Sequence, residues 1–479
     1  MTGDIIIQYY FFIKIRLSVR YGQEGDLSMD ALNNVLNEID TILWGVPLIV
    51  LLLGTGIYLT LRLNLLQVFR LPLALKLIFK AKNNGEGDVS SFKALCVALA
   101  ATVGTGNIVG VATAVKLGGP GAVFWMWVAA FFGMATKYAE GLLAVKYRDV
   151  DEKGEIAGGP MFYIKNGMGE KWAPMAAFFA FACILVAFFG IGTFPQVNAI
   201  VDSMKIAFGV PVWITDATIT ILVAAITIGG LQSISRVAGK IVPFMAVIYV
   251  IISIGLILMN ISAVPDAVAL IIRSAFTGEA AAGGFAGSTI MMAMQKGIAR
   301  GIFSNESGLG SAPIAAAAAK TKWPAEQGLI SMTGTFIDTI IICSMTGLAL
   351  VLTGVWKGEA AGAMMTTNAF AMAYGHAGVI LLTVCLALFA FTTILGWNYY
   401  GERACIYLFS TKGVLPYRII FIALVASGAF LKLDAIWTLA DIVNGLMAIP
   451  NLIALVALAG VIVNETKLYM EHLKNGEDD

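Results

Sequence analysis

The most informative segment of the chain is ALAATVGTGNIVGVATA, residues 98–114. It lies in an apolar stretch long enough to cross a membrane, yet its centre carries Gly104, Thr105, Gly106 and Asn107. Each glycine weakens a helix by about 1 kcal/mol relative to alanine, so a plain membrane helix has no need of this string. Two interpretations stay open: the small residues allow close helix packing, as in GxxxG interfaces, or the helix is unwound at mid-depth.

The composition around this segment is that of a membrane protein. Of 479 residues, 59% are apolar and 13% are charged, and the mean hydropathy is +0.84. A soluble domain with so few charges lacks the polar surface that keeps it in solution. The net charge of +1 and the scattered Lys and Arg residues exclude nucleic acid as a partner. The five cysteines and two histidines show no metal-ligand spacing and no catalytic motif is present, so we expect no enzyme and no cofactor.

The spans can be placed by length. A helix needs about 20 apolar residues to cross the hydrocarbon core, which predicts an all-α polytopic membrane protein with about 11 transmembrane helices. We expect residues 1–40 to lie outside the fold, two repeats at 92–261 and 282–464, and a cytoplasmic tail at 465–479. The predicted helices are an extra N-terminal helix at 41–63; core helices 1 to 5 at 92–117, 121–146, 175–203, 211–230 and 237–261; and core helices 6 to 10 at 282–303, 327–353, 376–401, 416–431 and 435–464.

The basic residues predict the orientation. Lys and Arg in short loops are retained on the cytoplasmic side, and alternate loops of this chain hold most of them, including those from Arg62 to Lys93 and from Arg300 to Lys322. We therefore predict a multi-pass protein of the plasma membrane with its N-terminus outside and its C-terminus in the cytoplasm.

A second span carries a similar interruption. Residues 291–313 read MMAMQKGIARGIFSNESGLGSAP, in which polar residues and glycines break an apolar run before SNESG ends it. Each interrupted span is the first of a set of five, and an odd-numbered repeat unit inserts with opposite orientations in its two copies. Such a pair indicates a binding site near the middle of the bilayer, where free N–H groups can hold a carboxylate and free C=O groups can hold a cation.

Several strings together carry a family resemblance. They are ATVGTGNIVGVATA (101–114), GPGAVFWMW (119–127), ATKYAEG (135–141), AGGPMFYI (157–164), RGIFSNESGLGSAP (300–313) and GWNYYGER (396–403). Over about residues 35–465 the sequence resembles the alanine/glycine:cation symporter family. The resemblance implies sodium-coupled import of alanine or glycine through a leucine-transporter-type fold, a five-plus-five inverted repeat in which core helices 1 and 6 are broken.

The resemblance also implies a set of site residues. The substrate's carboxylate and amino group would meet the broken part of core helix 1, and side chains of helices 3, 6 and 8 would complete the pocket. The matching substrate-binding positions are Gly104, Thr105, Gly106, Asn107, Gln196, Met294, Ile298, Thr393 and Trp397. Met294 stands where the family often has an aromatic residue, which implies a pocket of slightly different size.

The chemistry of an amino-acid zwitterion fits these residue types. Asn107 and Gln196 each offer an amide oxygen for the ammonium group and an amide N–H for the carboxylate, and the sequence does not assign which serves which. Trp397 follows Thr393 by four residues, so the two share a helix face. A tryptophan wall would admit Ala, Gly or Ser; the alternative is that Trp397 anchors the helix at the membrane interface.

A cation site can be built from neutral oxygens. The hydroxyls of Thr392 and Thr393, with freed carbonyls near Ala101 and Gly104, would form an oxygen cage suited to Na⁺. The alternative is that both hydroxyls bond back to their own helix. Acidic residues inside a membrane are costly and commonly functional.

Three such acidic residues lie in the predicted spans: Glu140, Asp338 and Asp441. Asp338 and Asp441 leave proton coupling open, whereas Glu140 near Lys137 predicts a structural ion pair at the cytoplasmic end of helix 2.

Residues 304–307 have two possible roles. Where helix 6 exits on the cytoplasmic side, Asn305 and Glu306 could cap the next helix, or Arg300 and Glu306 could pair as an inner gate. The function predicted from all these residues is Na⁺-coupled symport of alanine or glycine across the lipid bilayer by alternating access. Proton coupling is the first alternative and a channel the second, although channels commonly repeat one filter loop in symmetric subunits.

Overall fold

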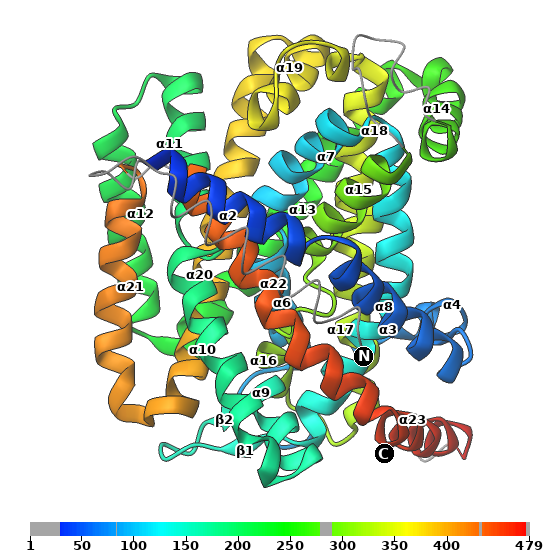
Figure 1. Ribbon diagram of the computed structural model, residues 1–479, viewed down its shortest axis with the longest axis vertical. Helices are drawn as coiled ribbons and strands as arrows, with labels where there is room; N and C mark the ends of the chain where they lie inside the picture. The colour runs from blue at the N-terminus through cyan, green and yellow to red at the C-terminus, as the bar shows by residue number, and fades with distance from the viewer. Residues whose placement is uncertain (1–28, 83, 278–289, 431–433, 476–479) are drawn as a thin grey trace.

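The fold is described by a computed structural model covering residues 29–82, 84–277, 290–430 and 434–475. Helices dominate, and the β1–β2 hairpin is the sheet found in this part of the chain. Figure 1 shows a helical bundle with α14 and α19 at one end and the hairpin and α23 at the other. In the described residues, seven helical segments are long and apolar enough to cross a membrane, or up to nine if each of two bent pairs is one span. This confirms an all-α polytopic membrane fold.

The N-terminal helices belong to the fold. Helix α2 packs on α22, and the indole Nε1 of Trp44 donates to the carbonyl of Asp441 at 2.7 Å. The prediction that residues 1–40 lie outside the fold is therefore wrong for residues 29–40, while residues 1–28 fall outside the described part. The elements are α2 (Met29–Leu43), α3 (Val46–Arg62), α4 (Leu66–Phe69) and α5 (Leu71–Lys80).

The first core helix is broken, as one of the two interpretations of residues 98–114 predicts. Its halves are α6 (Ser91–Thr102) and the pair η1 (Gly106–Gly110) and α7 (Val111–Gly118), bent by 51°. Predicted helix 3 is also interrupted, by a turn at residues 190–193. The remaining elements are α8 (Gly121–Lys146), β1 (Asp149–Val150), β2 (Ile156–Ala157), α9 (Pro160–Phe162), η2 (Tyr163–Gly167), η3 (Glu170–Trp172), α10 (Ala173–Phe189), α11 (Phe194–Phe208), α12 (Val212–Thr227), α13 (Gly230–Met259), η4 (Ile261–Ala263) and α14 (Val264–Phe276).

The second core set departs from its predicted boundaries at helix 6. Helix α15 (Ile290–Asn305) is continuous through Gly297 and Gly301, and the irregular segment is 306–311, followed by the short helix α16 (Ala312–Ala317). Residues 301–319 are all buried, so the SNESG segment lies inside the protein. Residues 282–289 of the predicted span lie outside the described residues.

The later helices mostly lie near their predicted positions. They are α17 (Pro324–Thr335), η6 (Phe336–Cys343), α18 (Ser344–Thr353), η7 (Val355–Lys357), α19 (Gly362–Tyr374), α20 (His376–Phe409), η8 (Thr411–Gly413), α21 (Val414–Gly428), α22 (Asp434–Ala457) and α23 (Ala459–Lys474). The predicted tail is instead helical, because α23 follows α22 after a bend of 61° and continues to Lys474. Helices α14 and α19 were not predicted; α19 packs on α20, α7 and η1 and so covers the second half of the broken helix.

Candidate binding site at the broken helix

The break in core helix 1 lies directly against α20 and α11. A Cβ atom on Gly104 would come within 2.4 Å of the Thr393 hydroxyl oxygen and 3.3 Å of the Gln196 amide oxygen. One turn away, a Cβ atom on Gly396 would lie 2.8 Å from the backbone of Ala101. Only glycine allows these approaches, so the two helices meet with their polar groups in contact.

The polar groups at the break are partnered within the protein. The Gly104 N–H donates to Asn107 Oδ1 at 2.9 Å, and the Thr105 N–H donates to Gln196 Oε1 at 3.3 Å. Gln196 in turn donates from Nε2 to Thr105 Oγ1 at 3.1 Å and to the Ile191 carbonyl at 3.0 Å. The structure therefore brings together Gly104, Thr105, Asn107 and Gln196, and a bound zwitterion would have to replace some of these bonds.

Asn107 also ties the broken helix to η6. Its Nδ2 donates to Asp338 Oδ1 at 2.7 Å, and Asp338 Oδ2 accepts from the hydroxyls of Ser304 at 3.0 Å and Thr339 at 2.7 Å. Ser304 faces the break, because a Cβ on Gly106 would lie 3.1 Å from its Cα. Both η1 and η6 are π-helical, a local widening that is frequent at functional sites. Sequence reasoning missed Ser304 and the two π-helices.

The two threonines proposed for the cation bond back to their own helix. The hydroxyls of Thr392 and Thr393 both donate to the Phe389 carbonyl at 3.0 Å. A hydroxyl that donates a hydrogen bond keeps its lone pairs, so each oxygen can still coordinate a cation. The back-bonding alternative and an oxygen cage around Thr393 and Gly104 are thus compatible.

Trp397 is not an interfacial anchor. Its side chain is fully buried, and its Nε1 donates to Glu306 Oε1 at 3.0 Å. Glu306 also accepts a short hydrogen bond from the Ser311 hydroxyl, so its carboxylate fixes the irregular segment after α15. Of the two alternatives considered for residues 304–307, the pairing of Arg300 with Glu306 is not found, because Arg300 pairs with Asp441 of α22 at 2.9 Å.

The irregular segment 306–311 is held by a second buried carboxylate. Glu140 Oε1 accepts from the backbone N–H groups of Gly308 and Gly310, each at 3.1 Å, and from Asn451 Nδ2 at 2.7 Å. Lys137 donates to the Glu306 carbonyl at 3.1 Å. Among the described residues, the predicted ion pair of Lys137 with Glu140 is not formed as a direct contact: both side chains are buried and contact the segment after α15.

Two asparagine side chains contact the irregular segment 306–311, those of Asn305 and Asn451. The Asn305 side chain accepts from the Ser307 N–H at 2.9 Å, within the irregular segment. It does not cap the next helix, α16, whose N-cap residue is Ser311 and which has no side-chain capping bond. Sequence reasoning missed Asn451, for which the available signal was an amide side chain in the middle of an apolar span.

A small cavity adjoins the break. It has a volume of about 190 Å³ and is lined by Thr105, Gly106, Val109, Gly110, Thr113, Arg300 and Phe303. Met294 and Ile298, predicted to line the pocket, are not among these residues and pack in or against the apolar core. The α15 residues at the cavity are Arg300 and Phe303, whose guanidinium and ring are 5.2 Å apart.

The hairpin closes the opposite end of the bundle. Arg403 of α20 pairs with Asp151 at 3.1 Å and with Glu155 at shorter range, and both Arg403 and Asp151 are buried as side chains. Glu152 accepts from the hydroxyls of Ser410 and Thr411 at 2.8 Å each, and these bonds lower the pKa of this carboxyl. The hairpin is thereby fastened to the end of α20.

A helical membrane protein whose first core helix is broken beside a small cavity has the architecture of a secondary transporter. The comparisons agree: the Sodium:alanine symporter family matches residues 29–479, and the chain belongs to this family. It is a sodium-coupled amino-acid symporter and not an enzyme.

Individual relatives support this membership. The chain is 60% identical to an uncharacterized transporter of Haemophilus influenzae, over 92% of this chain and 97% of the relative. It is 49% identical to the sodium/alanine symporter AgcS of Methanococcus maripaludis, over 92% and 98%. Among solved structures, MhsT in complex with L-phenylalanine has a similar fold, with a TM-score of 0.55 and 12% identity over 80% of this chain and 99% of that one.

Proposed function

We propose that the protein imports a small neutral amino acid, alanine or glycine, together with Na⁺ by alternating access. The observation that carries this proposal is the contact of Gly104 with Thr393 and Gln196, where there is no room for one added methyl group. Neutral oxygens gathered at a broken helix suit a hard cation and an ammonium group without burying an unpaired charge. The M. maripaludis relative is named a sodium/alanine symporter, which agrees with this choice of substrate.

Each predicted residue has a role in this proposal. The broken segment 104–107 and Gln196 bind the zwitterion, and Trp397 limits the size of its side chain. The carbonyls of Ala101 and Gly104 and the hydroxyls of Thr392 and Thr393 hold Na⁺. Met294 and Ile298 remain proposed wall residues from helix 6, although, like Gln196, Thr393 and Trp397, they do not line the cavity next to the break.

The first experiment is uptake into liposomes that contain the purified protein. Radiolabelled alanine, glycine and glutamine are compared under an inward gradient of Na⁺, of K⁺ alone and of H⁺ alone. Glutamine is included because a Bacillus subtilis relative, 36% identical, is named a probable sodium/glutamine symporter. We expect Na⁺-driven uptake of alanine or glycine and none of glutamine; uptake of glutamine alone would overturn the substrate assignment.

The cation role is tested by two matched variants. Thr393→Val keeps the branched shape but removes the hydroxyl, whereas Thr393→Ser keeps the hydroxyl and removes a methyl group. We expect Thr393→Val to raise the Na⁺ concentration for half-maximal uptake at least tenfold and Thr393→Ser to change it little. Equal effects of both would contradict a Na⁺ ligand at this position.

Proton coupling is the second candidate, and one observation favours it. Asp338 is a fully buried carboxyl that contacts Asn107 of the broken helix. The H⁺ gradient of the same assay tests it, with Asp338→Asn as the variant. Uptake driven by H⁺ alone and lost in this variant would replace Na⁺ by H⁺ as the coupling ion.

We further propose that the two ends of the bundle are the two gates. With the N-terminus outside, the cavity beside the break faces the outside, so Arg300, which the sequence groups with the cytoplasmic basic residues, lies on the outer side of the site. The hairpin held by Arg403 faces the cytoplasm. Arg300 with Asp441 then closes the outer path, and Glu306 acts as a fixed support behind the site. The plasma membrane and a cytoplasmic C-terminus follow from the same orientation.

A further inference from the structure

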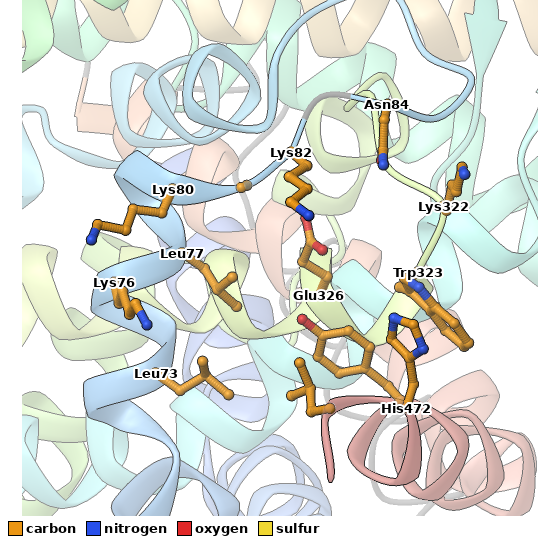
Figure 2. Close-up of a pocket in the computed structure, with 13 residues that line it drawn as sticks. Leu73, Lys76, Leu77, Lys80, Lys82, Asn84, Lys322, Trp323, Glu326 and His472 are labelled. Carbon is orange, nitrogen blue, oxygen red and sulfur yellow. The ribbon is translucent and has the colours of Figure 1, made fainter. Parts of the chain in front are cut away.

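A basic pocket lies apart from the binding site, where three distant segments of the chain meet. Helix α5 and the residues after it, the start of α17 and helix α23 enclose a cavity of about 590 Å³. Figure 2 shows these segments with the side chains that line it. Helices α5 and α23 both pack on α17, so the pocket is part of the fold rather than a gap between loose ends.

The charges around the pocket are strongly one-sided. Its lining includes four exposed lysines and a single carboxylate, toward which Lys82 points in Figure 2: Lys76, Lys80, Lys82, Lys322 and Glu326. Lysine ammonium groups at one concave site attract an anion with several oxygens, such as a phosphate. The pocket therefore fits a ligand with a phosphate group.

The neighbouring surface is apolar and lies at the end of a membrane span. The candidate span Asn34–Arg62 ends a few residues before α4 and α5, which expose Phe69 (70%) and Phe79 (81%). Rings this exposed, next to a span end, fit the acyl chains of a lipid better than water. Because Lys76 and Lys80 are four residues apart on the same helix as Phe79, charge and apolar contact occur together.

The inner wall of the pocket is aromatic. Trp323 stacks on His472 with ring centroids 4.6 Å apart and lies 5.7 Å from the Tyr469 ring. Tryptophan and tyrosine are enriched at the level of lipid headgroups, because one end of each is apolar and the other polar. An aromatic wall of this kind suits a pocket at the headgroup level of the bilayer.

We propose that this pocket binds the headgroup of an anionic phospholipid from the leaflet next to the C-terminal end of the bundle. The lysines bind the phosphate, and the exposed rings of α4 and α5 lie against the acyl chains. Helix α5 packs on α6, the inner half of the broken helix, so a bound lipid stabilises one side of the element that must move during transport. A free phosphate ion would use the lysines but not the rings, and so is not the ligand that the surface fits.

The test measures phosphatidylglycerol bound to the purified full-length protein in phosphatidylcholine nanodiscs or in detergent, by native mass spectrometry and titration. The variant is the triple substitution Lys76→Gln, Lys80→Gln and Lys322→Gln. Its matched control replaces three exposed lysines elsewhere on the protein: Lys153→Gln, Lys171→Gln and Lys412→Gln. We expect the pocket variant to lose phosphatidylglycerol affinity about tenfold or more and the control less than twofold.

A charge-preserving variant and a competition with inorganic phosphate complete the test. The corresponding triple Lys→Arg variant keeps the charge and should retain the affinity. An unchanged thermal unfolding midpoint of the Gln variant in detergent shows that it does not simply misfold. Inorganic phosphate at millimolar concentration should not displace the lipid. Equal losses in the pocket and control variants, or displacement by inorganic phosphate, would overturn a specific lipid site.

Discussion

At the scale of the residue, Gly104 has little freedom to change. An added methyl group would lie 2.4 Å from the Thr393 hydroxyl, and overpacking of this kind costs about 1–3 kcal/mol. We predict that Gly104→Ala lowers Na⁺-driven alanine uptake at least tenfold. The matched control is Gly54→Ala on α3, where no atom lies within 4 Å of the added Cβ. Normal uptake by Gly104→Ala would show that the contact opens without cost.

A second prediction at this scale concerns Glu140. Two glycine N–H groups and the Asn451 amide donate to one of its oxygens in a buried site. Removing the acceptor leaves these donors unpaired, at about 1–3 kcal/mol each. We predict that Glu140→Ala lowers the thermal unfolding midpoint in detergent by several degrees. Glu170→Ala, which removes a carboxylate that is 80% exposed, serves as control and should shift the midpoint by about a degree or less.

The sequence predicted the position of single site residues well where the backbone required an unusual residue, such as glycine within a span. Gly104 and the segment after it stood out because glycine in a span needs a reason, and the resemblance pointed to Gln196 and Thr393, which the structure places at Gly104. The contact of Trp397 with Glu306 could not be predicted, since the two are 91 positions apart and each has other possible partners. Long-range polar contacts of this kind depend on the packing of whole helices.

At the scale of the element, glycines inside an apolar span have two physical causes. In α6 and η1 the glycines accompany a bend of 51°, whereas α15 stays helical through Gly297 and Gly301. A Cβ on Gly297 would lie 2.3 Å from the Ala122 carbonyl oxygen, so this glycine allows α15 to pack closely on α8. Composition alone cannot separate a break from a close contact, which is why the predicted break in helix 6 was misplaced.

The hairpin gives the prediction that belongs to this scale. Arg403 and Asp151 form a buried ion pair, and leaving one charge without its partner costs about 3–5 kcal/mol. We predict that Arg403→Gln speeds hydrogen exchange in residues 149–157 and favours an inward-open protein. Lys153→Gln, an exposed position in the same hairpin, is the control. Unchanged exchange in Arg403→Gln would mean that other contacts hold the hairpin.

At the scale of the whole molecule, transport requires that the two ends do not open together, and that Na⁺ binds one state better than the other. All five cysteines are buried, so a single introduced cysteine can report on the outer path. Thr113 lines the cavity beside the break, which makes the rate of maleimide labelling of Thr113→Cys a measure of outer opening.

In this background we predict that Arg300→Gln raises the labelling rate severalfold, because it removes the ion pair that joins α15 to α22. Asp441→Asn should have the same effect, and the double variant should add little to either single one, since both remove one interaction. Lys357→Gln removes an exposed positive charge from the η7 segment and should leave the rate unchanged. If the two single effects instead add in full, Arg300 and Asp441 act separately, and the outer path is closed by something other than their pairing.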